Sequence, residues 1–326
     1  MSRSGAASAR TFPSRPTSDR VKSRLIEDEG AAAADAAEFF RSPPFLEAEA
    51  VTHTLTIEGD HELRLPLIVR EIEGTDRVDA ISPYGYPGAD RSPDDPPDPA
   101  TIDWSDTGLV SIFVRDRVGD RPCFAGGTVR SQVHVAESEE GIRKRLREQI
   151  RRNERRGWET LLVPGREVEM GHLDGFERAY TETMARAGAA ERYLYPTSYL
   201  ARLLMSEPSW LLLAEREGEA LAGAIAAASD GSLHYYLGGT ADEALRDSPM
   251  KNLFWAMIAH GSELGLPVSL GGGITPGDSL DEFKRGFANA QAPWYTHELI
   301  CDAEAYDELT KGAGEAPDGF FPAYRA

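Results

Sequence analysis

Residues 210–239 read WLLLAEREGEALAGAIAAASDGSLHYYLGG, and this stretch decides the fold of the second half of the chain. Two apolar runs, 210–215 and 220–228, flank Glu217-Gly218, a pair typical of a tight turn. The pattern therefore predicts a β-hairpin, and the run 233–239 predicts a further strand beside it.

The segments around this hairpin alternate between strand and helix patterns. Ser248-Pro249 starts a helix well, because Ser can cap free amide groups and the fixed φ of Pro suits the first helical position. The predicted strands are 158–163 and 267–273, and the predicted helices are 173–187, 198–205 and 248–264. The order strand, two helices, three antiparallel strands, helix, strand resembles the GNAT acyltransferase fold over residues 155–300.

The first half of the chain carries further strand patterns. They cover 51–57, 62–70, 109–114 and 132–135, the first two with period-two alternation. Residues 89–99 (ADRSPDDPPDP) predict a loop. Residues 1–40 are rich in Ala, Ser, Arg and Pro without sustained periodicity, and they predict a disordered tail.

Composition limits the class of protein. The 326 residues suit two domains, and 41% hydrophobic content is ordinary for a globular chain. No apolar run reaches the roughly 20 residues that span a bilayer, and no secretory signal is apparent. Only Cys123 and Cys301 are present, and the seven histidines are scattered, so we expect no metal site and a cytoplasmic protein with reduced thiols.

A GNAT enzyme that uses coenzyme A cradles the pyrophosphate with backbone amides of a glycine-rich loop before the central helix. The corresponding stretch here, Glu243–Lys251, contains no glycine, places Pro249 where an amide donor is wanted, and adds the negative Asp247. The sequence therefore disfavours a coenzyme A site, and we expect no cofactor.

Several short motifs resemble, in the same order, those of the Fem-type aminoacyl-tRNA-dependent transferases. They are RNERRG (152–157), LGGT (237–240), SPM (248–250), GGG (271–273) and FKRGF (283–287), with SPYGYPG (82–88) in the first domain. The resemblance covers roughly residues 60–300. It implies a mixed-sheet α+β protein with two tandem GNAT-like domains, the first degenerate. The expected boundaries are 41–152 and 153–300, with 301–326 as a C-terminal segment that can pack on the first domain.

The reaction implied by this resemblance is attack by an acceptor amine on the ester of an aminoacyl-tRNA. Such a reaction needs positioning and stabilisation of the developing oxyanion rather than ATP or a metal. Lys284 matches the lysine that family members place near the tRNA 3′ end, although a solvated lysine at a helix–strand junction is the alternative. Asp278 is a candidate base, and equally a cap of the next helix.

Further residues are candidates for contacts with the substrates. Tyr84 and Tyr86 are rigid aromatics on a Gly/Pro loop that suits either an acceptor pocket or a structural turn. Arg192 and Tyr193 fall where peptidoglycan-directed members contact an acceptor phosphate. Phe283 and Arg285 flank Lys284 and are candidates for substrate contacts. The alternatives are that Phe283 lies in the protein core and that Arg285 is solvated.

Eight basic residues lie between Arg143 and Arg156, against only Glu148 and Glu154, in a chain whose net charge is −19. This basic stripe suits the phosphates of a tRNA or, alternatively, a solvated helix face. The residues we expect to contact tRNA are Arg147, Arg151, Arg152, Arg155 and Arg156.

We therefore predict an aminoacyl-tRNA-dependent transferase that forms an amide on a small amine acceptor. The chain is shorter than the bridge-forming Fem enzymes and lacks the pattern of their helical arm, which favours a natural-product intermediate such as a peptidyl nucleoside over a peptidoglycan precursor. The alternatives are a GNAT N-acyltransferase that uses a coenzyme A or carrier thioester, and a non-catalytic GNAT-like binding module.

Overall fold

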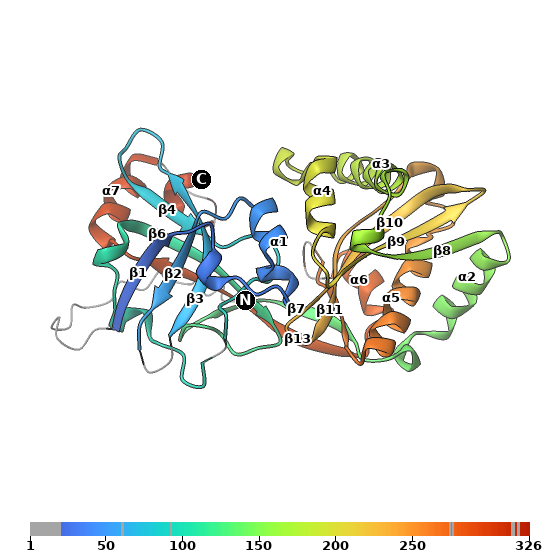
Figure 1. Ribbon diagram of the computed structural model, residues 1–326, viewed down its shortest axis with the longest axis horizontal. Coiled ribbons are helices and arrows are strands. Elements are labelled where there is room, and N and C mark those ends of the chain that lie inside the picture. Colours follow the sequence, from blue (N-terminus) through green and yellow to red (C-terminus); the bar gives the residue numbers. More distant parts are fainter. Residues whose placement is uncertain are drawn as a thin grey trace, which may run out of the picture. The chain divides into compact units, whose positions relative to one another are not determined.

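The structure is a computed structural model that describes residues 21–59, 62–91, 93–273, 275, 277–313, 317 and 320–326. The chain forms two compact units (Figure 1). Unit 1 contains residues up to 34, 49–130 and 295–326, and unit 2 contains 35–48 and 131–294. None of the described helices is long and apolar enough to cross a membrane.

Unit 2 is built on a mixed sheet with the order β7-β12-β11-β10-β9-β8. Neighbouring strands from β8 to β11 are antiparallel, whereas β11 and β12 are parallel. The strands are β7 (Thr128–Ala136), β8 (Trp158–Pro164), β9 (Ser209–Arg216), β10 (Glu219–Ser229), β11 (Ser232–Thr240) and β12 (Val268–Gly271). The predicted hairpin and its neighbouring strand are confirmed as β9, β10 and β11.

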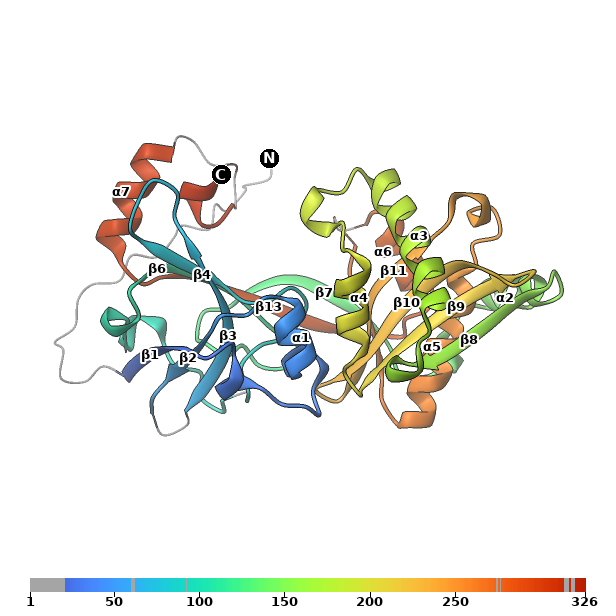
Figure 2. The same cartoon turned by 45° about the horizontal axis from the view of Figure 1, so that its top comes forward.

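Helices cover both faces of this sheet, with α3 and α4 on one face and α2 and α5 on the other (Figures 1 and 2). The core between α5 and the sheet includes Leu212, Ala224 and Phe254. The helices of unit 2 are α1 (Pro43–Ala48), α2 (Lys144–Glu154), α3 (Met170–Ala187), α4 (Thr197–Leu204), α5 (Met250–Leu264) and α6 (Ser279–Arg285). Ser248 does not cap α5 as predicted, because it adopts a φ of 54° and the helix begins after Pro249 without a side-chain cap.

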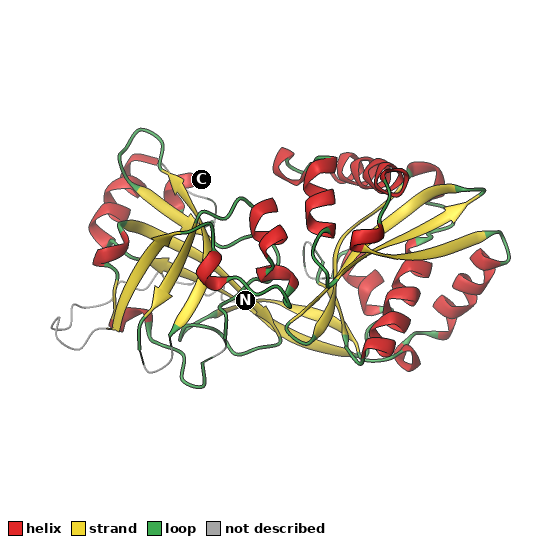
Figure 3. Cartoon of the chain, in the orientation of Figure 1, coloured by secondary structure: helices red, strands yellow, loops and turns green. Residues whose placement is uncertain are grey.

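Unit 1 repeats the same pattern of pairing with few helices (Figure 3). Strands β1 to β4 are successively antiparallel, and β4 is parallel to β6. The elements are β1 (Val21–Glu27), β2 (His53–Ile57), β3 (Leu63–Glu71), β4 (Val78–Ile81), β5 (Ile102–Asp103), β6 (Leu109–Val118) and α7 (Ala303–Ala313). Strand β13 (Ala290–Ile300) passes from unit 2 into unit 1 at Tyr295 and follows β6 in the strand order.

Two sequence expectations differ from the structure. Part of the tail predicted as disordered (residues 1–20) lies outside the described residues, but β1 pairs with β2 from Ser23 onward, and Phe39 and Phe40 are fully buried, so the prediction is wrong for residues 21–40. The expected boundary after residue 152 lies instead between Arg130 and Ser131. The physical reason is that β7 pairs with β12, a partner more than 130 residues away that sequence spacing does not reveal.

The C-terminal segment lies in unit 1 and is anchored by a buried carboxylate. Asp79 is fully buried and accepts hydrogen bonds from Arg325 Nε (2.5 Å) and Tyr324 Oη (3.0 Å), while Arg70 Nε donates to its other oxygen at 2.9 Å. These bonds attach the last residues of the chain to β4.

Candidate active site

Helix α6 positions Lys284. Asp278 caps the helix, because its Oδ1 accepts from the Asp281 amide at 2.7 Å and its Oδ2 accepts from the Thr275 amide at 2.9 Å. The cap fixes where the helix begins, and Asp281 and Lys284 then lie one turn apart on the same face. Asp278 is therefore the N-cap of α6. A helix cap was the alternative to a general base in the sequence analysis.

The Lys284 side chain is turned into unit 2 and is not solvated. The residue is only 6% exposed, its Nζ donates to the carbonyl of Gly272 at 2.8 Å, and it lies 5.3 Å from the centre of the Tyr235 ring. Burial lowers the pKa of the Lys284 ammonium to about 8, while the charges of Asp278 and Asp281 act in the opposite direction. The amine therefore carries its charge less readily than an exposed lysine does.

A buried carboxylate–imidazole pair lies beside this lysine. His134 of β7 is 2% exposed, and its Nε2 lies 2.7 Å from Oδ1 of Asp281. The hydrogen bond with His134 and the contact with Arg285 hold the pKa of Asp281 below its ordinary value. Asp281 thus stays ionised next to Lys284 and favours the charged form of the amine.

Sequence reasoning missed His134, Asp281 and Tyr235 as parts of this site. Asp281 precedes Lys284 by one helical turn, a spacing that the sequence does display. His134 is 147 residues from Asp281, and no local pattern connects the two.

The other residues of the FKRGF motif divide between core and surface. Phe283 packs against Phe254 and Phe287, with ring centres 5.1 and 5.4 Å away, and Phe287 is fully buried. Arg285 is half exposed and pairs with Asp281. A substrate contact by Phe283 or Arg285 remains a prediction.

Four predicted substrate contacts lie elsewhere. Arg192 and Tyr193 belong to a short 3-10 helix (Glu191–Tyr193) of unit 2, where the guanidinium lies 5.0 Å from the tyrosine ring centre. Tyr84 and Tyr86 lie in unit 1 on the loop after β4, the first 39% exposed and the second half-buried. Burial raises the pKa of the Tyr86 phenol.

The basic stripe is the outer face of α2 and its C-terminal end. Ile150 and Asn153 face inward, and five of the eight basic residues fall within the helix. Arg151, Arg152 and Arg155 are exposed and Arg147 is half-buried; Arg156 is also exposed and pairs with Asp247 at 2.9 Å. The stripe is therefore available to a partner, and tRNA as that partner remains a prediction.

Two backbone amides at the N-terminus of α5 and the nearby Asp247 are engaged in hydrogen bonds within the protein. The amides of Lys251 and Asn252 donate to the carbonyls of Ser248 and Pro249 at 3.2 and 2.8 Å. Asp247 accepts from Arg216 at 3.0 Å as well as from Arg156. The absence of a coenzyme A site stays a prediction.

Comparisons with known proteins address the fold. A family model described as an acetyltransferase (GNAT) domain matches residues 141–285. The crystal structure of FemX matches with a TM-score of 0.56 and 12% identity, covering 78% of this chain and 89% of that chain. The C-terminal domain (DUF2156) of a putative lysylphosphatidylglycerol synthetase from Agrobacterium fabrum matches with a TM-score of 0.51 and 14% identity, covering 87% and 94%. No curated protein sequence matches significantly. The chain thus has a Fem-like GNAT fold, as its motifs predicted.

Proposed function

We propose that the protein is an aminoacyltransferase that moves an amino acid from aminoacyl-tRNA to an amine acceptor. The observation that carries the proposal is the buried ammonium of Lys284, held at 2.8 Å from the Gly272 carbonyl within a GNAT-type unit. A cation in such a dry environment interacts strongly with a developing negative charge.

In the proposed reaction the acceptor nitrogen attacks the ester carbonyl carbon of the aminoacyl-tRNA. The carbonyl oxygen becomes an oxyanion, which Lys284 stabilises as a charged hydrogen-bond donor. The bond to the ribose oxygen then breaks, and the proton of the acceptor amine passes to that oxygen. Asp278 and Asp281 support the step by favouring the charged form of Lys284, and no protein base is required.

The fold similarity to FemX supports the choice of donor. The exposed arginines of α2 supply a surface that suits tRNA phosphates, in a chain that is otherwise strongly acidic. The occupied amides at the start of α5 argue against an acyl-coenzyme A donor.

The order of strands in unit 1 supports its derivation from a second GNAT-like domain. Three antiparallel pairings followed by a parallel one occur in β1 to β6 as they do in β8 to β12. Among the described residues, however, unit 1 lacks a counterpart of α5 between β4 and β6. We therefore include a degenerate first domain in the proposal. The proposed acceptor is a small natural-product intermediate, because the sequence lacks the pattern of the helical arm of the bridge-forming Fem enzymes.

The test is transfer of radiolabelled amino acids from a charged tRNA mixture to a panel of small amines. We expect transfer that RNase abolishes and that acyl-coenzyme A does not replace. Lys284→Ala is expected to lower the rate about 100- to 1000-fold, the usual effect of losing an oxyanion donor. Lys311→Ala changes an exposed lysine of α7 and serves as the matched control.

The outcomes separate the alternatives. Transfer from acyl-coenzyme A that resists RNase would identify a GNAT N-acyltransferase. Full activity of Lys284→Ala would refute the role of Lys284. Binding of a peptide or glycan precursor without any transfer would indicate a non-catalytic module.

A further inference from the structure

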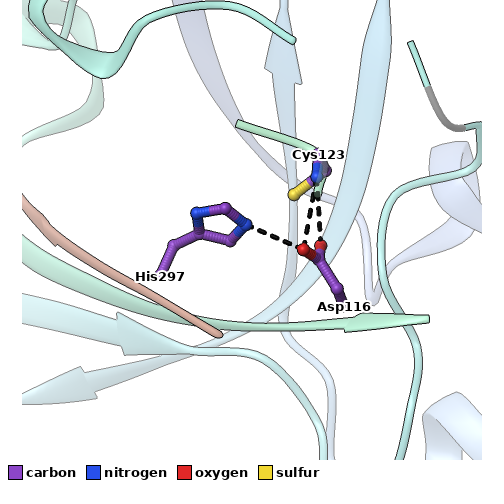
Figure 4. Close-up of side chains that lie close together, drawn as sticks. All are labelled: Asp116, Cys123 and His297. Carbon is purple, nitrogen blue, oxygen red and sulfur yellow. Dashed lines mark hydrogen bonds and ion pairs between the residues drawn. The ribbon is translucent and has the colours of Figure 1, made fainter. Parts of the chain in front are cut away.

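Unit 1 contains a buried cluster of three side chains that can each bind a metal ion. Asp116, Cys123 and His297 are 2%, 3% and 2% exposed, and their ligand atoms all lie within 4.8 Å of one another. Figure 4 shows the carboxylate, the thiol and the imidazole gathered at one point. The three residues come from β6, the loop after it and β13, so distant parts of the chain converge here.

The surroundings hold the three side chains close together. Nε2 of His297 lies 2.8 Å from Oδ2 of Asp116, and the Cys123 amide donates to the same carboxylate at 3.3 Å. Phe124 is fully buried and meets the His297 ring edge to face, with ring centres 5.4 Å apart. A Cβ atom on Gly127 would come within 2.7 Å of the His297 ring, so only glycine leaves room for the imidazole.

The donor set selects the kind of ion. One sulfur, one imidazole nitrogen and one carboxylate oxygen are ligands of zinc, whereas calcium and magnesium prefer oxygen ligands alone. A thiolate and a carboxylate neutralise a divalent cation, so the filled site carries no net charge into the apolar interior. Ordinary zinc bond lengths separate tetrahedral ligands by about 3.3 to 3.7 Å. The His297 nitrogen and the Asp116 oxygen, now 2.8 Å apart, would have to move apart to bind the ion.

We propose that Asp116, Cys123 and His297 bind one structural zinc ion, with water as the fourth ligand. The ion would join β6 and the loop that follows it to β13. The three residues belong to unit 1, whereas Lys284 belongs to unit 2, so we assign the ion a role in stability and not in transfer chemistry.

The proposal is tested on the full chain, stripped with a chelator and titrated with Zn²⁺ against a competing chromophoric chelator. We expect about one equivalent to bind and the melting temperature to rise. Cys123→Ser and His297→Gln should each weaken binding at least about 100-fold, because changes outside the ligand shell already cost 10- to 100-fold. Cys301→Ser, which changes the other free cysteine, is the matched control and should bind normally.

Substitution with Co²⁺ provides a spectroscopic readout. A thiolate–cobalt charge-transfer band in the wild-type protein supports coordination by Cys123, provided that Cys301→Ser retains the band. Binding of less than about a tenth of an equivalent of Zn²⁺ with no change in melting temperature would overturn the proposal and leave a hydrogen-bonded triad. Equal binding by wild type and Cys123→Ser would overturn it as well.

Discussion

Replacing Lys284 by Met removes a buried charge and keeps a side chain of similar length. Burial lowers the pKa of Lys284 from 10.5 to about 8, so the unfolded chain binds the proton more tightly than the folded one. Below pH 8 both states are protonated, and the charge costs the fold about 3 kcal/mol. As the pH rises from 8 toward 10.5 the folded state releases its proton first, and the cost declines to about 1 kcal/mol at pH 9.5.

The substitution also leaves the Gly272 carbonyl without this donor, which costs about 1 kcal/mol at either pH. We therefore expect Lys284→Met to stabilise the protein by about 2 kcal/mol at pH 7, and to be close to neutral at pH 9.5. A gain in stability at pH 7 would mean that this lysine costs the fold stability, as is common for functional groups.

Urea denaturation followed by tryptophan fluorescence measures the effect, since four of the five tryptophans belong to unit 2. Comparing variant and wild type at each pH isolates the contribution of Lys284. Lys311→Met, on the surface, should stay within about 0.5 kcal/mol at both pH values. A clear loss of stability at pH 7, or a difference that does not change with pH, would refute the reasoning.

Three further predictions concern other parts of the chain. Changing Arg151 and Arg155 to Glu should weaken tRNA binding in a filter assay. It should also reduce the slope of log K against log salt concentration by about one to two. An unchanged slope would mean that the stripe is a solvated helix face. Asp79→Ala should cost about 3 kcal/mol in thermal unfolding, because it leaves Arg325 and Tyr324 without their buried acceptor, and a loss below about 1 kcal/mol would contradict this. Gly239→Ala should destabilise by about 1 to 3 kcal/mol, since its Cβ would lie 2.5 Å from the α3 backbone, whereas Gly171→Ala, with open space around it, should be neutral or stabilising in the same assay.

The strands and helices with strong periodicity were predictable from the sequence. The runs 210–215 and 220–228 gave β9 and β10 because alternating or continuous apolar residues around a glycine turn leave few other structures. Strand β13 was missed, since its sequence AQAPWYTHELI mixes a proline with polar residues and has no clear alternation. Strand β1 was missed because lysine, serine and arginine dilute its pattern.

The candidate site was only partly predictable. Lys284 emerged from a motif, and its burial depends on β11 and β12, which contribute Tyr235 and the strand that Gly272 follows. The pairing of His134 with Asp281 arises from packing between residues far apart in the sequence. The same limit applies to Asp116, Cys123 and His297, whose spacing of 7 and 174 residues gave no metal-binding pattern.

The division of the chain into units has a consequence for its synthesis. Unit 1 is assembled from three separate stretches, and its last stretch, with β13 and the Asp79 contacts, begins at residue 295. The 164 residues from 131 to 294 must leave the ribosome first, which takes roughly ten to thirty seconds at ordinary translation rates. During that time the strand edge of β6 awaits its partner, and unit 2 has all of its residues only when this stretch is complete. No single cut of the chain releases either unit intact, so each must be studied within the whole protein.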